Sequence, residues 1–318
     1  MPKIVILERE TVGLDVSVDR ISQLGEVTVY PVSNAENVAG RIQDADIIIA
    51  NKCPLNAETL KNAAKVKLIC EFATGYDNID LDYCRQRGIK VANARNYCTA
   101  AVTQHTFALC LYILVKLRHY DEYVKSGTYA GQPNFSNFDL PFNELEGRTW
   151  GIIGMGHIGS SVAKVAAAFG CRVVFFSPTG KSNCTQYTRL SFDELLKESD
   201  FLSLHCPLSD ITRGLIDLTA LRKMKPSAIL INVARGPLVV DEDLYTALCE
   251  NIIAGAGLDV TSTEPMKDTN PLSRFMDSNR LIITPHNAWA SLEARNRVVC
   301  ETYENIAAFL RGEERNLV

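Results

Sequence analysis

Short apolar runs alternate with amphipathic segments along the first ninety residues. The apolar runs are rich in Ile and Val and do not alternate strictly with polar residues. Strands of this kind are covered on both faces, so the pattern predicts a parallel sheet between layers of helices. Helices are expected after an N-cap at Asn56 and from about Asp80 to Gly88. The expected strands span residues 3–7, 27–30, 46–50, 67–71 and 89–92.

The same alternation restarts at Thr149. A long apolar helix is expected before it, over residues 99–125, followed by an aromatic arm at 129–145 that shows no clear period. A final amphipathic helix is expected over 291–310, with Gly312 as its C-terminal stop. The six expected strands of this second sheet are TWGIIG, CRVVFF, FLSLHC, AILINV, AGAGLDV and LIIT.

Two sheets in one chain predict a two-domain α/β protein. We expect a doubly wound, parallel-sheet domain of the Rossmann type over residues 99–289. We expect a smaller, flavodoxin-like α/β substrate domain, built discontinuously from residues 1–98 and 290–318. The last helix would then return to the first domain and leave a cleft between the two.

Composition narrows the class of protein. The chain has 318 residues, of which 47% are hydrophobic, and 33 Lys and Arg against 37 Asp and Glu give a net charge of −4. This balance argues against nucleic acid as a partner, because such binding relies on clustered cations. The longest apolar run, Phe107–Val115, is too short to span a membrane, and no secretory signal is expected. Ten cysteines without a CxxC pair predict reduced thiols in the cytoplasm and no metal site.

The segment GIIGMGHIGSS carries a dinucleotide-binding signature. Gly154, Gly156 and Gly159 form G-x-G-x-x-G between an apolar strand and an Ala-rich helix. The first glycine permits the tight turn, the second lets the backbone approach a pyrophosphate, and the third lets helix and strand pack closely. The helix N-terminus offers free N–H groups to the anion. The strand and helix lie where this mechanism needs them, which indicates NAD(H) or NADP(H) as the coenzyme.

The choice between the two coenzymes stays open at this point. An acidic residue that binds the adenosine ribose is expected at the end of the next strand, but Ser177 lies there. Without that carboxylate a 2′-phosphate is not repelled, and Ser177, Thr179 and Lys181 could bind it. The alternative is that Ser177 bonds a ribose hydroxyl and Lys181 is only solvated.

Three polar residues follow the later strands of the second sheet. Arg235, Glu264 and His286 each have an ordinary structural explanation when taken singly. Because ligands bind beyond the carboxyl ends of parallel strands, the three are expected at one edge. Together they match the needs of hydride transfer to a 2-oxo acid. A guanidinium grips the substrate, an imidazole supplies the proton, and a carboxylate orients the imidazole and favours its charged form.

Several spaced motifs resemble one enzyme family. The glycine loop, INVARGPLVVDEDLYTAL, AGAGLDVTSTEP and TPHNAWAS occur in the order found in the D-isomer-specific 2-hydroxyacid dehydrogenases. ATGYDNIDLDYCRQRGIKVAN and AAVTQHTFAL extend the resemblance over nearly the whole chain. Within the family, PHNAWAS followed by EAR is most similar to the glycerate dehydrogenases, also called hydroxypyruvate reductases.

The resemblance implies a role for each matching residue. Arg235 would bind substrate, His286 would be the acid/base, and Glu264 would orient it. The backbone around Ala73, Thr74 and Gly75 would hold the substrate carboxylate. The further coenzyme contacts that it implies are His157, Ile158, Cys206, Pro207, Val233 and Asp259.

Two further residues keep alternative interpretations. Trp289 would close the pocket or would only pack the domain junction. Lys52 would touch a substrate hydroxyl or carboxylate, or would be a solvated surface lysine. The family often has Glu near the start of the helix that begins AAVTQHTFAL. This chain has Gln104 there, so the resemblance assigns no role to that position.

The implied activity is reversible hydride transfer between NAD(P)H and a small 2-oxo acid such as hydroxypyruvate or glyoxylate, giving the D-2-hydroxy acid. An alternative is a dehydrogenase that acts on D-lactate or another 2-hydroxy acid. The alternative that is not an enzyme is a dinucleotide-sensing, corepressor-like protein. The family pattern also implies a homodimer. The aromatic arm supports this, since a monomer would expose Tyr129, Phe135, Phe138 and Phe142.

Overall fold

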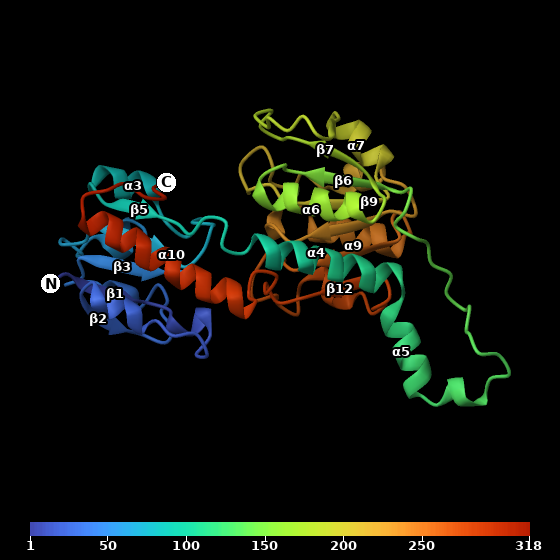
Figure 1. The fold of residues 1–318 in the computed structure, drawn as a ribbon, viewed down its shortest axis with the longest axis horizontal. Coiled ribbons are helices and arrows are strands. Elements are labelled where there is room, and N and C mark those ends of the chain that lie inside the picture. Colours follow the sequence, from blue (N-terminus) through green and yellow to red (C-terminus); the bar gives the residue numbers. More distant parts are fainter. The chain divides into compact units, whose positions relative to one another are not determined.

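The computed structural model describes residues 1–318, which form two compact units (Figure 1). One unit combines Met1–Cys98 with Trp289–Val318, and the other is Thr99–Ala288. Each is built on one parallel sheet, which confirms the expected α/β class. All ten cysteines are free thiols, and seven of them are buried.

The sheet of the smaller unit has the order β2-β1-β3-β4-β5. All of its strand pairs are parallel. Every residue of β3 and β4 is buried, as the uninterrupted apolar runs predicted. The strands are β1 (Lys3–Ile6), β2 (Glu26–Val29), β3 (Ile47–Ala50), β4 (Leu68–Glu71) and β5 (Lys90–Ala92).

Helices cover both faces of this sheet. α1 (Val38–Arg41), α2 (Ala57–Leu60) and α3 (Leu81–Gln86) share one apolar core with the strands, and α10 (Leu292–Leu310) packs against β4. Asn56 caps α2, because its side chain accepts hydrogen bonds from the N–H groups of Glu58 and Thr59. The expected caps and the final helix are therefore confirmed. The 3₁₀ turns of the smaller unit are η1 (Arg9–Val12) and η2 (Asp19–Gln23).

The larger unit has a seven-stranded sheet in the order β12-β11-β10-β9-β6-β7-β8. The chain starts at β6 in its interior and proceeds outward in both directions, which is the doubly wound arrangement. The six expected strands are confirmed. A seventh, β8, is only two residues long and was not predicted. The strands are β6 (Thr149–Ile153), β7 (Arg172–Phe176), β8 (Thr188–Arg189), β9 (Phe201–Leu204), β10 (Ile229–Asn232), β11 (Gly255–Leu258) and β12 (Leu281–Ile283).

Two layers of helices enclose this sheet (Figure 1). On one face lie α4 (Thr99–Leu114) and α6 (His157–Ala168), which pack on each other, and the ring of Phe107 packs at a tilt against Trp150 of β6. On the other face α7, α8 and α9 complete the main apolar core. Their bounds are Phe192–Glu198, Leu218–Leu221 and Asp241–Cys249, and the 3₁₀ turns are η3 (Thr128–Gly131), η4 (Gly236–Leu238) and η5 (Pro271–Arg274).

The prediction of a single helix over residues 99–125 is wrong. The chain forms α4 and then α5 (Leu117–Lys125), bent by 60° where they meet. Lys116 adopts a left-handed φ of 56°, which ends regular α-helical geometry at that residue. From there α5 and the aromatic arm run away from the sheet of this unit (Figure 1). No single helix is long and apolar enough to cross a membrane, although α4 and α5 meet that criterion when taken as a pair.

Candidate active site

The turn between β6 and α6 has the shape of a dinucleotide cradle. Gly154 has a φ of 95°, and a Cβ there would lie 2.7 Å from the backbone nitrogen of Cys206. A Cβ on Gly159 would lie 2.1 Å from the carbonyl oxygen of Gly154, so only glycine fits either position. The side of Gly156 is open, with no atom within 4 Å of its would-be Cβ. This open backbone at the N-terminus of a twelve-residue helix fits a pyrophosphate.

His157 and Ile158 form the first turn of α6, and Gly156 is its N-cap. His157 is exposed and Ile158 is half-buried. Their backbone N–H groups belong to the first turn, where no intrahelical carbonyl is available to accept from them. Both residues are therefore at the place where a coenzyme phosphate would be expected.

The end of β9 lies directly beside the glycine turn. The backbone N–H of His205 donates to the carbonyl of Ile153 at 2.8 Å, and Cys206 packs against Gly154. Burial raises the pKa of the Cys206 thiol to about 11, so this side chain is a neutral packing group. Burial lowers the pKa of His205 to about 3, and its imidazole is neutral. Pro207 follows on the exposed surface.

Ser177 is buried at the end of β7 and begins a turn that the N–H of Gly180 closes by donating to its carbonyl. Thr179 and Lys181 are exposed on this turn. Arg189 of β8 also reaches it, since its guanidinium donates to the carbonyl of Gly180 at 3.0 Å. Sequence reasoning missed Arg189 because its approach depends on the short pairing of β8 with β7.

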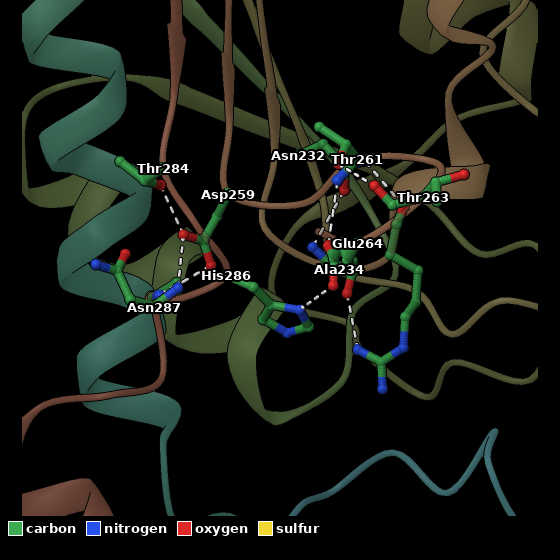
Figure 2. Close-up of polar contacts among 11 residues, drawn as sticks. Asn232, Ala234, Asp259, Thr261, Thr263, Glu264, Thr284, His286 and Asn287 are labelled. Carbon is green, nitrogen blue, oxygen red and sulfur yellow. Dashed lines mark hydrogen bonds and ion pairs between the residues drawn. The ribbon is translucent and has the colours of Figure 1, made fainter. Parts of the chain in front are cut away.

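Glu264 and His286 are in direct contact. Figure 2 shows the imidazole of His286 facing the carboxylate of Glu264, and the Nδ1 and Oε2 atoms are 2.6 Å apart. Their side chains are 34% and 24% exposed. Such a short contact is typical of a hydrogen bond to a charged group, and it fixes the orientation of the ring. Since Nδ1 is engaged, Nε2 is the nitrogen that can face a substrate.

Arg235 lies on the loop that packs against the Glu264 loop. The loop follows β10, where the side chain of Asn232 donates to the carbonyl of Arg235 at 2.9 Å. A Cβ on Gly236 would lie 1.8 Å from the carbonyl oxygen of Thr261, and the N–H of Thr261 donates to Glu264. The loops after the adjacent strands β10, β11 and β12 therefore carry Arg235, Glu264 and His286 respectively.

Val233 and Asp259 continue the same strands. Val233 follows β10 and is 9% exposed, while Asp259 follows β11 and is 1% exposed. The carboxylate of Asp259 accepts a hydrogen bond from the hydroxyl of Thr284 (Figure 2). It also accepts one from the N–H of Ala288. His105 of α4 also bonds Thr284. The only sequence signal for His105 was its polarity within an apolar helix.

The remaining predicted site residues belong to the smaller unit. Ala73, Thr74 and Gly75 follow β4, and the hydroxyl of Thr74 donates to the carbonyl of Ala94. Lys52 follows β3 with an exposed side chain, and its N–H donates to the buried carboxylate of Glu8 at 2.9 Å. The ring of Trp289 meets that of Tyr97 edge-on, with centroids 6.1 Å apart.

A glycine cradle on a doubly wound sheet, with a paired imidazole and carboxylate beyond neighbouring strands, defines a nucleotide-dependent oxidoreductase. Residues 107–288 match the family model for the D-isomer specific 2-hydroxyacid dehydrogenase, NAD binding domain. The chain belongs to this family, which confirms the resemblance seen in its sequence. It is an NAD(P)-dependent oxidoreductase acting on 2-hydroxy acids.

Three similar proteins cover almost the entire chain. Hydroxypyruvate reductase of Blautia hydrogenotrophica is 38% identical over 99% of both chains. An acyclic imino acid reductase in complex with NADPH and D-Arg is 30% identical, with a TM-score of 0.88 over 99% of both chains. D-lactate dehydrogenase of Aquifex aeolicus, complexed with NAD and lactic acid, is 29% identical. Its TM-score is 0.87 over 98% of this chain and 96% of that one.

Proposed function

We propose that the protein reduces a small 2-oxo acid, hydroxypyruvate or glyoxylate, to the corresponding D-2-hydroxy acid, and catalyses the reverse reaction. The observation that carries this proposal is the 2.6 Å contact between His286 and Glu264 beside the Arg235 loop. The choice of substrate is supported by the 38% identity to a hydroxypyruvate reductase. When bound, the reduced nicotinamide supplies the hydride.

His286 is the acid/base in this proposal. Its Nε2–H donates a proton to the carbonyl oxygen of the substrate as that oxygen gains negative charge, and Nε2 accepts the proton in the reverse direction. The Glu264 carboxylate holds the ring through Nδ1 and favours the charged imidazolium that precedes proton donation. General acid catalysis of this kind contributes about 10²–10⁴-fold to a rate.

Arg235 is the proposed substrate-binding cation. A guanidinium presents parallel N–H donors that match the carboxylate and carbonyl of a 2-oxo acid. In the smaller unit, we propose that the backbone of Ala73, Thr74 and Gly75 also binds the substrate carboxylate. Lys52 and Trp289 would contact the rest of the substrate. The assignment of coenzyme binding to the larger unit and substrate binding to the smaller one belongs to the same proposal.

For the coenzyme, Gly154, Gly156, His157, Ile158 and Gly159 would hold the pyrophosphate. Cys206 and Pro207 would line the adenosine side, and Val233 and Asp259 the nicotinamide end. The described residues fit this role, because the open side of Gly156 leaves room that a side chain would fill.

We further propose that the chain prefers NADP(H). Three features support this: no carboxylate follows β7, Thr179 and Lys181 lie on the turn after Ser177, and the Arg189 guanidinium is bonded to the same turn. A cation held at this position would pair with a 2′-phosphate. If Ser177 only bonds the ribose hydroxyls, NADH would be used at least as well.

A cytoplasmic homodimer completes the proposal. Free thiols at all ten cysteines suit a reducing compartment. The aromatic arm exposes large rings that a second copy of the chain would cover. The exposed fractions are 40% for Tyr129, 90% for Phe135, 83% for Phe138 and 51% for Phe142. A monomer in multi-angle light scattering would contradict the dimer.

The test of the function is a panel of 2-oxo acids assayed with NADH and NADPH. The panel contains hydroxypyruvate, glyoxylate, pyruvate and a branched-chain 2-oxo acid, and the readout is the absorbance of the reduced nicotinamide. We expect the highest kcat/KM with hydroxypyruvate or glyoxylate. A preference for pyruvate would indicate that the protein is a D-lactate dehydrogenase instead. Coenzyme binding without turnover of any acid would favour a dinucleotide-sensing protein.

A further inference from the structure

Asp259 accepts hydrogen bonds from three consecutive residues of the turn on which His286 lies. The backbone N–H of His286 donates to the carbonyl of Asp259 at 2.8 Å. The N–H of Asn287 donates to Oδ1 of Asp259 at 3.0 Å (Figure 2). The N–H of Ala288 donates to Oδ2 at 2.8 Å. Three consecutive backbone donors therefore end on Asp259.

The turn needs such support because His286 has a φ of 53°. Left-handed backbone is unfavourable for a residue with a Cβ, and it persists only where the surrounding contacts determine it. The bonds to Asp259 are those contacts. The direction of the imidazole toward Glu264 thus depends on how the Asp259 carboxylate is held.

Two side chains orient that carboxylate. The hydroxyl of Thr284 lies 2.6 Å from Oδ1 of Asp259, and Nε2 of His105 lies 2.9 Å from the same hydroxyl. The Nε2 atom is also 3.4 Å from Oδ1. Because the one hydroxyl proton of Thr284 goes to the carboxylate, its oxygen must accept from His105. Nε2 of His105 therefore carries a proton, and the chain of donors runs from His105 through Thr284 to Asp259.

We propose that His105 is a positioning residue for the acid/base turn. From α4, it fixes the carboxylate of Asp259 through Thr284, and Asp259 in turn fixes the left-handed backbone at His286. The effect on turnover rests on the proposed function of His286. The effect on the turn itself does not.

Hydrogen exchange measures the turn directly, whatever the substrate. His105→Leu and Thr284→Val remove the two donors and keep the apolar bulk of each side chain. His105→Gln and Thr284→Ser keep a donor and serve as rescue variants. Gln104→Ala, an exposed neighbour on α4, is the matched control. The readout is amide exchange in peptides that contain residues 286–288, followed by mass spectrometry.

We expect exchange at these amides to speed up by about tenfold in His105→Leu and in Thr284→Val, the size expected for losing a hydrogen bond to a charged group. The rescue variants and the control should exchange like the wild type. In the 2-oxo acid assay, kcat should fall by a similar factor in the two disruptive variants, while KM for the acid changes less than threefold.

The two proposals fail in different ways. Unchanged exchange at residues 286–288 in both disruptive variants would overturn the positioning role, whatever the activity. Faster exchange in a protein that turns over no 2-oxo acid would support the positioning role and reject the proposed function. Equal losses in the rescue and disruptive variants would mean that the hydrogen bonds of His105 and Thr284 do not cause the effect, and would also overturn the proposal.

Discussion

The Nδ1 atom of His286 lies 2.6 Å from the Oε2 atom of Glu264, although the two residues are carried on loops after different strands. The contact orients the imidazole. Glu264→Gln would keep a hydrogen-bond acceptor and remove the negative charge. Reduction requires the charged imidazolium, so we expect the alkaline fall in kcat/KM to begin at lower pH in this variant. A full pH–rate profile measures this, and an unshifted profile would show that the carboxylate charge does not matter.

Arg235 should act on substrate binding and turnover together. Arg235→Ala removes the guanidinium on the loop beside Glu264, and we expect kcat/KM for the 2-oxo acid to fall by at least about 100-fold, the scale of a lost bidentate ion pair. Arg235→Lys keeps the charge without the planar fork and should recover only part of the loss. Binding of the coenzyme, measured by fluorescence titration, should stay within about twofold, which distinguishes this effect from misfolding.

We expect Arg189 and Ser177 to determine whether the protein prefers NADPH or NADH. Arg189→Ala should raise KM for NADPH by about tenfold, since one charge-assisted contact to the phosphate is lost, and leave KM for NADH unchanged. Ser177→Asp should reverse the preference, because a carboxylate repels the 2′-phosphate and accepts from the ribose hydroxyls. Steady-state kinetics with both coenzymes tests both variants. If Arg189→Ala affects the two coenzymes equally, the proposed phosphate contact is wrong.

Glu71 should make stability depend on pH. It is buried at the end of β4, and this burial raises its pKa to about 8 despite the hydrogen bond from Asn78. The unfolded chain releases this proton near pH 4.5, whereas the folded chain keeps it up to about pH 8. The free-energy contribution of Glu71 is therefore complete below pH 4.5 and is lost as the pH rises to about 8.

Glu71→Gln should remove that loss, because the amide is neutral at every pH and can still accept from Asn78. We expect the variant to gain stability over the wild type between pH 5 and pH 8, by up to about 1.4 kcal/mol per pH unit. Urea unfolding across this range measures it. Glu58→Gln, on the exposed first turn of α2, is the control and should behave as the wild type. A parallel pH dependence in wild type and Glu71→Gln would refute the assignment.

Much of the fold was predictable because its signals are local. Apolar runs without alternation gave the strands, and Asn56 and Gly312 marked helix ends. The helix break at Lys116 was not predictable, because nothing in the neighbouring sequence indicates that a lysine adopts a left-handed backbone conformation. The two residues of β8 were too few to show a period.

Some residues of the candidate site were predictable from the sequence, and others were not. Arg235, Glu264 and His286 could be picked out because each follows a recognisable strand, and parallel strands bring such residues to one edge. The contacts of His105 with Thr284 and of Arg189 with Gly180 could not, because they join elements by side-chain reach. No sequence pattern indicates the left-handed backbone of His286 either, and the role of Asp259 depends on that conformation.

The most direct test of the account is the reduction of hydroxypyruvate by His286→Ala. The preferred coenzyme is used at saturation, with circular dichroism to confirm an unchanged fold. Wild-type protein should turn over hydroxypyruvate, and the variant should lose at least about 100-fold in kcat because the proton donor is gone. A variant that retains the wild-type kcat would contradict the assignment of His286 as the acid/base and the chemistry built on it.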